Sequence, residues 1–149
     1  MNRFRHREIA GAIIIDTLGR FLLQQRDNVV GIVHPGKVGL FGGHREGDET
    51  YLECVVREVR EELTFQIPAE RFEHLASWDG PDLDVDGGTL CADFFITRDV
   101  PADALFITEG TLLTIEMQYV TTIEHNLAPS ARFAMTAFNR REGTQRQVK

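Results

Sequence analysis

GHREGDETYLECVVREVREELTF, residues 43–65, is the most informative segment of the chain. Its Thr50-x-x-Glu53 pattern is a capping box, in which the threonine side chain accepts a backbone N–H and the glutamate reaches back to the cap. Apolar residues then follow at helical spacing, namely Leu52, Val55, Val56, Val59 and Leu63. The segment predicts a helix that begins after Thr50 and packs an apolar face on a core.

The opposite side of this helix carries three carboxylates. At about 100° per residue, the apolar face spans roughly 100°, while Glu58, Glu61 and Glu62 fall between about 180° and 280°. Like charges at these spacings repel, and the helix C-terminus also disfavours anions. A divalent cation would offset both effects, since Mg²⁺ prefers carboxylate oxygens. A solvated acidic face is the ordinary alternative.

The residues before the helix favour a site over a solvated face. Gly42 and Gly43 let the backbone approach a ligand closely, and a backbone carbonyl can itself bind a hard cation. A glycine pair, a capped helix and a carboxylate cluster together predict a site for phosphate and metal. His44 follows the pair and either contacts a phosphate or is an ordinary loop residue.

Residues 43–65 resemble the Nudix box, which runs glycine, five residues, glutamate, seven residues, then Arg-Glu-hydrophobic-any-Glu-Glu-any-Gly-hydrophobic. The positions that match are Gly43, Glu49, Arg57, Glu58, Val59, Glu61, Glu62 and Phe65. The resemblance implies an α/β fold, the family's α/β/α sandwich, with a mixed sheet flanked by helices. It also implies a hydrolase that acts on a phosphate–phosphate bond with Mg²⁺ or Mn²⁺.

The segment departs from the family pattern at two positions. Thr64 replaces the late glycine, and Phe41 stands where the family often has proline before the double glycine. A glycine suits a helix end with positive φ, which a β-branched residue resists, so we expect a different helix end here. Neither departure removes a carboxylate.

The resemblance assigns roles to the residues of the box. Glu61 and Glu62 would bind the metal, and Glu58 would be either a further ligand or the base that activates water. Arg57 would orient the cluster by pairing with Glu49, which also counts among the substrate-binding candidates. We therefore expect the catalytic group to comprise Arg57 and the three glutamates.

Residues around the box complete the expected site. The Gly42 carbonyl is a further candidate ligand, and Gly43 and His44 are candidates for substrate binding. Many relatives use one more acid from a distant loop. Glu109 is our candidate for that acid and Glu116 the second, although either would otherwise be taken for a surface residue.

Beyond this segment, apolar runs alternate with turn-forming residues. We predict strands over residues 9–16, 20–26, 38–41, 72–78, 89–97 and 117–122. Residues 130–139 predict a C-terminal helix, followed by a polar, frayed tail from Arg140. Strands flanked by two helices predict a sheet covered on both faces.

Residues 82–87, DLDVDG, resemble the start of an EF-hand calcium loop. An EF-hand needs helices on both sides, whereas the flanking segments here predict strands. We interpret the segment as a tight turn rich in Asp and Gly.

The composition limits the classes of partner. The 149 residues suit one domain over 1–149, and the net charge of −7 argues against long nucleic acid or an anionic membrane as the main partner. Two cysteines, Cys54 and Cys91, are too few for a disulfide scaffold. The N-terminus lacks the apolar region of a signal peptide, so we expect a cytoplasmic protein. Because dimers are frequent among relatives, a homodimer is consistent with the resemblance.

We therefore expect a metal-dependent pyrophosphohydrolase whose substrate is a nucleoside diphosphate linked to another group. Nucleoside triphosphates, ADP-ribose and nucleotide sugars all fit that description. The alternative is a Nudix-like domain that binds a nucleotide and regulates without turnover. Glu58, Glu61 and Glu62 favour the enzyme, since a binder would not need all three.

Overall fold

The structure is a computed structural model that describes residues 5–32 and 34–148. Its elements in chain order are β1 (His6–Asp16), β2 (Arg20–Gln25), β3 (Val38–Gly39), β4 (Phe41–His44), α1 (Tyr51–Leu63), η1 (Ala69–Arg71), β5 (Glu73–Pro81), β6 (Thr89–Val100), η2 (Ala102–Ala104), β7 (Thr111–Glu116), η3 (Met117–Asn126) and α2 (Pro129–Val148), where η marks short 3₁₀ helices. No helix among the described residues is both long and apolar enough to cross a membrane.

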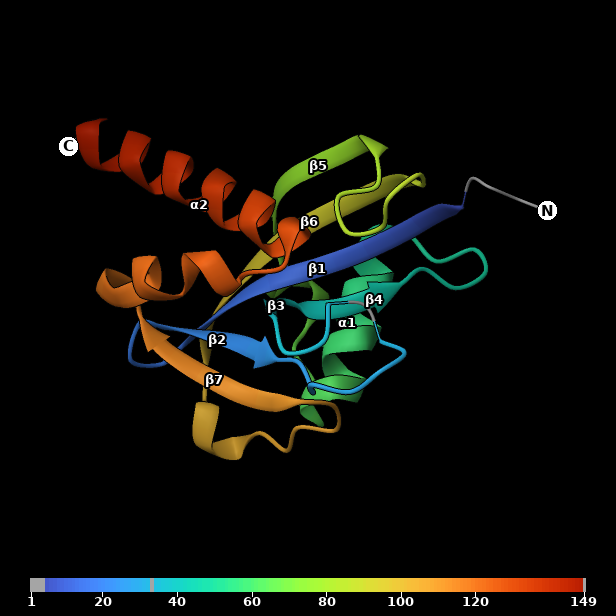
Figure 1. Cartoon of the computed structure of the whole chain (residues 1–149). Helices are drawn as coiled ribbons and strands as arrows, with labels where there is room; N and C mark the ends of the chain where they lie inside the picture. Colours follow the sequence, from blue (N-terminus) through green and yellow to red (C-terminus); the bar gives the residue numbers. More distant parts are fainter. Residues whose placement is uncertain (1–4, 33, 149) are drawn as a thin grey trace.

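The described strands form one mixed sheet between two helices. Its order is β3-β2-β1-β6-β5, with β4 also paired to β1 and β7 to β2. The long central strands β1 and β6 are parallel, and the other strand pairs are antiparallel. Helices α1 and α2 lie on opposite sides of β1 (Figure 1). The expected α/β/α sandwich with a mixed sheet is confirmed.

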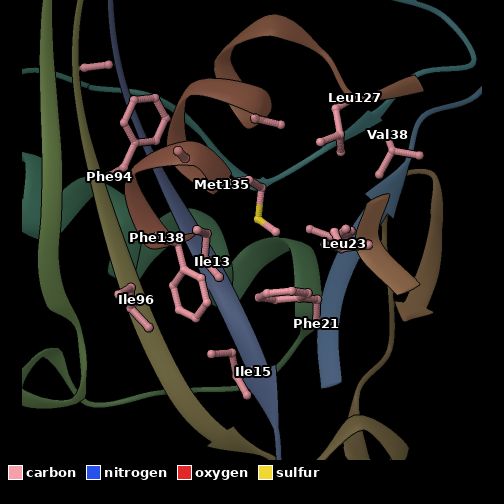
Figure 2. Packing of buried hydrophobic residues seen from close by; sticks show 14 of the residues in the cluster. Ile13, Ile15, Phe21, Leu23, Val38, Phe94, Ile96, Leu127, Met135 and Phe138 are labelled. Atoms are coloured by element: carbon pink, nitrogen blue, oxygen red, sulfur yellow. The ribbon is translucent and has the colours of Figure 1, made fainter. Parts of the chain in front are cut away.

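Alternation along β1 divides the core into two layers. Ile13 and Ile15 face α2, whereas Ala12 and Ile14 face α1. Figure 2 shows the α2 layer, where the ring of Phe138 meets that of Phe21 edge to face at 5.4 Å. The sheet is thus covered on both faces, and α1 packs against β1 and β4.

The capping box and the tight turn form as the sequence predicts. Thr50 Oγ1 accepts from the Glu53 N–H at 3.0 Å, and Glu53 Oε1 accepts from the Thr50 N–H at 2.8 Å. Residues 82–87 join the strands β5 and β6. The Arg7 guanidinium pairs there with Asp82 at 2.7 Å and with Asp84 at 3.4 Å. These acids therefore neutralise an arginine within a turn.

The predicted strand over residues 117–122 is wrong. That segment begins η3, and the strand is β7, directly before it, which pairs with β2 along its whole length. The Tyr, Val and Thr of residues 117–122 favour strands intrinsically, but Val120 alone is buried among the described residues of η3. Since β propensity depends on packing, it misleads where a segment lies on the surface.

The C-terminal helix is longer than predicted. It runs over Pro129–Val148 and not over residues 130–139, and proline suits its first turn because no N–H is needed there. The mostly polar residues from Arg140 to residue 148 continue the helix, so the predicted helix end at Asn139 is wrong. Straight-chain polar residues such as Arg, Glu and Gln are good helix formers, which accounts for the continuation.

Candidate functional site

A cleft of about 440 Å³ opens where β4 meets α1. Gly42 and Gly43 line it from β4, and Glu58 and Glu62 line it from α1. Glu109, from the loop before β7, reaches the same cleft. Glu58, Glu62 and Glu109 thus come from two distant segments of the chain, and Glu46 and Asp84 also line this cleft.

Glu62 is the most buried of these acids, with 7% of its surface exposed. The Gly42 N–H donates to its Oε1 at 2.8 Å. Burial, together with the nearby charges of Glu58 and Glu109, raises the pKa of Glu62 to about 8, although that hydrogen bond acts in the opposite direction. A buried carboxylate in this setting favours a nearby positive charge.

Arg57 organises the region beside the cleft. It binds Glu49 through two hydrogen bonds, Nε to Oε2 at 2.5 Å and Nη2 to Oε1 at 3.0 Å. Its Nη1 donates to Glu58 Oε1 at 2.9 Å, and its Nη2 also donates to the His44 carbonyl at 3.0 Å. The Arg57 hydrogen bonds lower the pKa of Glu49 to about 2. The expected Arg57–Glu49 pair is present, and it ties the loop after β4 to Glu58.

Gly43 is the residue that lets Glu58 approach β4. A Cβ at position 43 would lie 2.5 Å from the carboxyl carbon of Glu58 and 2.6 to 2.7 Å from its oxygens. No side chain fits there while the carboxylate keeps its place. Burial raises the pKa of Glu58, and the hydrogen bond from Arg57 opposes that shift.

The loop that carries Glu109 is docked on the C-terminus of α1. The Phe106 N–H donates to the Leu63 carbonyl at 3.0 Å, and the Thr108 N–H donates to the Glu62 carbonyl at 3.0 Å. Carbonyls in the last turn of a helix lack hydrogen-bond donors within the helix, and the N–H groups of this loop supply those donors. The position of Glu109 is therefore set by the helix that carries Glu58 and Glu62.

Gln24 fixes the same loop from the sheet. Its side chain is 4% exposed and donates from Nε2 to the Glu109 carbonyl at 3.0 Å. The second candidate acid, Glu116, lies opposite Arg20 in the β2–β7 pairing and does not line the cleft. The sequence did not indicate Gln24, because a single amide within a strand carries no pattern.

Thr64 takes the conformation that the family's glycine would take. Its φ of 52° and ψ of 45° are left-handed, so the expected change of helix end is wrong. The Thr64 hydroxyl donates to the Phe106 carbonyl at 2.9 Å. This hydrogen bond and the docked loop hold a threonine in a backbone region that costs it about 1–2 kcal/mol.

Two buried nitrogens of the cleft lack a hydrogen bond, although one of them, His34 Nε2, lies 3.6 Å from the Asp84 carboxylate. Arg26 and His34 both line it. Among the described residues, Arg26 Nε and His34 Nε2 are buried side-chain nitrogens without a hydrogen bond. A buried polar group left unpaired costs about 1–3 kcal/mol, so both nitrogens favour a ligand that accepts hydrogen bonds. An anion such as phosphate would satisfy them.

The donor set suits a hard divalent cation. Glu58, Glu62 and Glu109 offer only oxygen atoms, the ligands of Mg²⁺ and Mn²⁺, and Gly43 leaves room beside Glu58. Within residues 5–32 and 34–148, no three Asp, Glu, His or Cys side chains already stand close enough together to hold a metal ion.

A profile of the NUDIX domain matches residues 5–124, which include every element from β1 to β7. The chain belongs to the Nudix family. It is a Nudix hydrolase, as the box predicted. The matched range includes both the box and the Glu109 loop.

Solved structures share the Nudix fold with this chain. The MutT protein of Methanosarcina mazei Go1 gives a TM-score of 0.77 at 23% identity over 95% of this chain and 99% of that one. The NUDIX domain of Shewanella oneidensis NrtR, complexed with ADP ribose, gives a TM-score of 0.72 at 19% identity over 91% of this chain and 88% of that one. A bifunctional NMN adenylyltransferase/ADP ribose pyrophosphatase from Francisella tularensis, complexed with AMP and a Mn ion, gives a TM-score of 0.69 at 18% identity. That match covers 93% of this chain and 42% of that one. The comparison with curated proteins gives no match.

The structure gathers some Nudix-box residues in the cleft and leaves others outside. His44 lines the cleft through an exposed side chain. Glu61 does not line it: its side chain is 51% exposed and lies 3.3 Å from Arg57. Cys54 of α1 is fully buried beside Gly43. Burial raises the pKa of the Cys54 thiol to about 11, which disfavours a nucleophilic role.

Proposed function

We propose that this Nudix hydrolase cleaves a phosphate–phosphate bond in a nucleoside diphosphate linked to another group, with Mg²⁺ or Mn²⁺ as cofactor. The observation that carries the proposal is the convergence of Glu58, Glu62 and Glu109 on one glycine-lined cleft. Glu61 and the Gly42 carbonyl are further candidate ligands. Bound metal would neutralise the phosphate oxygens and acidify water.

The chain's own residues supply positioning and proton transfer. Arg57 holds Glu58 in place while it is itself fixed by both oxygens of Glu49. The Gly42 N–H fixes one oxygen of Glu62. In the reaction, a water oxygen bonds to phosphorus and the bond from phosphorus to the bridging oxygen breaks. The bridging oxygen leaves with the electron pair, and the water proton passes to a carboxylate, for which Glu58 is our candidate.

The cleft nitrogens that lack a hydrogen bond favour a phosphorylated substrate. We propose that Arg26 Nε donates to a substrate phosphate and that His34 lies beside it. Gly43 and His44 would form the adjoining wall of the cleft, and Glu49 would help to fix that wall. The ADP ribose and AMP held by the Shewanella and Francisella structures support a nucleotide-like ligand. The Mn ion of the Francisella structure supports Mn²⁺ as an alternative to Mg²⁺.

We also propose that residues 1–149 act as one domain in the cytoplasm. Both cysteines are free, one buried and one partly exposed, which fits a reducing compartment. A homodimer is compatible with this proposal and is tested below.

The experiment is a hydrolysis assay with the purified chain. Nucleoside triphosphates, ADP-ribose and nucleotide sugars are incubated with Mg²⁺ or Mn²⁺, and the products are separated by anion-exchange chromatography. Glu58→Gln and Glu62→Gln are compared with Glu116→Gln, a matched loss of one carboxylate outside the cleft. We expect cleavage of at least one compound, which EDTA stops and the two cleft variants reduce at least about 100-fold.

The outcome separates two functions. Cleavage that persists in Glu62→Gln, or that Glu116→Gln reduces equally, would contradict the role of the cleft acids. If a nucleotide raises the melting temperature but no compound is cleaved with either metal, the chain is a nucleotide-binding domain without turnover.

A further inference from the structure

A groove of about 810 Å³ lies beside the cleft and is lined from α2, β5, η3 and the segment before β3. We name it the basic groove. Lys37, Arg132 and Arg140 line it together with His34 and His125. No acidic residue is among the described residues that line it. A positive hollow of this kind in a chain with a net charge of −7 favours an anionic ligand.

Two of the cations are well placed for a ligand. Arg132 lies exposed near the start of α2, and its Nη2 donates to the Glu124 carbonyl at 2.9 Å. One hydrogen bond of this kind orients the guanidinium and leaves its other donors for a phosphate. Lys37 lines the groove from a different part of the chain, the segment before β3.

An aromatic ring forms part of the groove's wall. Phe133 lines the groove, and its ring packs against Trp78 edge to face at 5.3 Å and against Phe94 at 5.7 Å. Aromatic and apolar surface with a few cations is the usual lining of a nucleotide-sized site. Trp78 is the chain's single tryptophan, so its fluorescence reports on this wall.

The basic groove and the cleft are separated by one thickness of chain. From the end of η3 into the first turn of α2, Leu127 and Pro129 line the groove, while Ala128 and Ser130 line the cleft. The Ala128 N–H is bonded to the Val38 carbonyl at 2.8 Å, which fastens this partition to β3. His34 lines both hollows, so its side chain borders each of them.

We propose that the basic groove binds a second phosphate-bearing group of the substrate, at the end remote from the bond that is cut. The substrate would then be two nucleotide-sized groups joined through phosphates, with the acidic cleft on one half and the groove on the other. This inference rests on the proposed function, because it takes the groove ligand to be part of the hydrolysed molecule. Each hollow is large enough for a nucleotide-sized group.

The test uses Trp78 fluorescence, which does not depend on turnover. The probes are a dinucleoside tetraphosphate and ATP, both with methylene groups in place of the bridging oxygens, so that neither is cleaved in the presence of Mg²⁺. Lys37→Gln and Arg132→Gln each remove one groove cation. Arg71→Gln is the matched control, since Arg71 lines neither hollow.

We expect saturable quenching by the dinucleoside compound, with its Kd raised about tenfold in each groove variant and unchanged in Arg71→Gln. The Kd of the ATP analogue should change less than twofold. Equal losses for both probes would show an independent anion site and overturn the spanning arrangement. Absence of quenching would show that the groove binds no such group. A dimer in light scattering that Arg132→Gln dissociates would show that a second copy of the chain covers the groove. Either result would overturn the proposal.

The two proposals can fail separately. If the wild-type chain cleaves no anhydride but the quenching pattern holds, the proposed hydrolysis is wrong and the groove site stands as a binding site. If cleavage occurs and the groove variants leave KM unchanged for a cleavable dinucleoside tetraphosphate, the spanning arrangement is wrong and the hydrolysis stands.

Discussion

Gly43→Ala should separate catalytic geometry from folding. The new Cβ would lie 2.5 Å from the Glu58 carboxyl carbon, whereas ordinary contact begins at 3.4 Å. The carboxylate therefore has to move by about 1 Å, and a displacement of about 1 Å at a reacting centre costs roughly 100-fold in rate. Because the displaced group ends a flexible side chain, the free energy of unfolding should change by less than about 1.5 kcal/mol.

The assay measures kcat, KM and urea denaturation on the same preparations. We expect kcat to fall about 100-fold in Gly43→Ala, with KM within about twofold. Gly42→Ala is the contrasting variant: its φ is +151° and its Cβ would overlap the Ala10 carbonyl, so the fold itself should be destabilised. If Gly43→Ala keeps more than half of the activity, or loses it only through unfolding, the reasoning about Glu58 is refuted.

Three further predictions concern stability. Folding lowers the pKa of Glu49 from 4.5 to about 2, so its pair with Arg57 stabilises the fold above pH 4.5 and loses that effect as the pH falls toward 2. The melting temperatures of wild type and Glu49→Gln should converge over that range, and a constant gap would contradict the pair. Thr64→Gly should be about 0.5–1 kcal/mol more stable to urea than Thr64→Ala, because the left-handed backbone penalises a Cβ; the opposite order would exclude that conformation. Phe138→Ala should cost about 3–5 kcal/mol in urea denaturation, since its buried ring packs on Phe21; a loss below about 1 kcal/mol would contradict the packing of α2.

Local rules account for the parts of the fold that the sequence predicted. The capping box and the apolar spacing of α1 depend only on neighbouring residues, and they are present as expected. The apolar runs of β1 and β6 are strong signals because both strands are central and buried. By contrast, β7 pairs with β2 at the side of the sheet away from β1, and its residues are at best half-buried, so its pattern is weak.

The candidate site was predictable only where it is contiguous in sequence. Glu58 and Glu62 lie on one helix, and their spacing alone brings them together. Glu109 required the family resemblance, since nothing in its own neighbourhood indicates that its loop docks on α1. Gln24 and Arg26 reach the cleft from β2 and the residue after it, and long-range pairing of this kind leaves no local pattern.

Thr64 shows how tertiary contacts override a local preference. A threonine resists positive φ, which suggested another helix end. The Phe106 carbonyl accepts its hydroxyl, and the loop from Phe106 to Thr108 caps the last turn of α1. These contacts form only in the folded chain, and they offset the strain.

The most direct test of the central claim is hydrolysis in ¹⁸O-labelled water. The best substrate from the panel is incubated with Mg²⁺, and the products are analysed by mass spectrometry for wild type, Glu62→Gln and Glu116→Gln. We predict one labelled oxygen on one phosphate product for both wild type and Glu116→Gln. Glu62→Gln should form this product at least about 100-fold more slowly, and no product should form when EDTA is present. Label-free products, or equal rates in both variants with EDTA present, would contradict a metal-assisted attack of water governed by the cleft carboxylates.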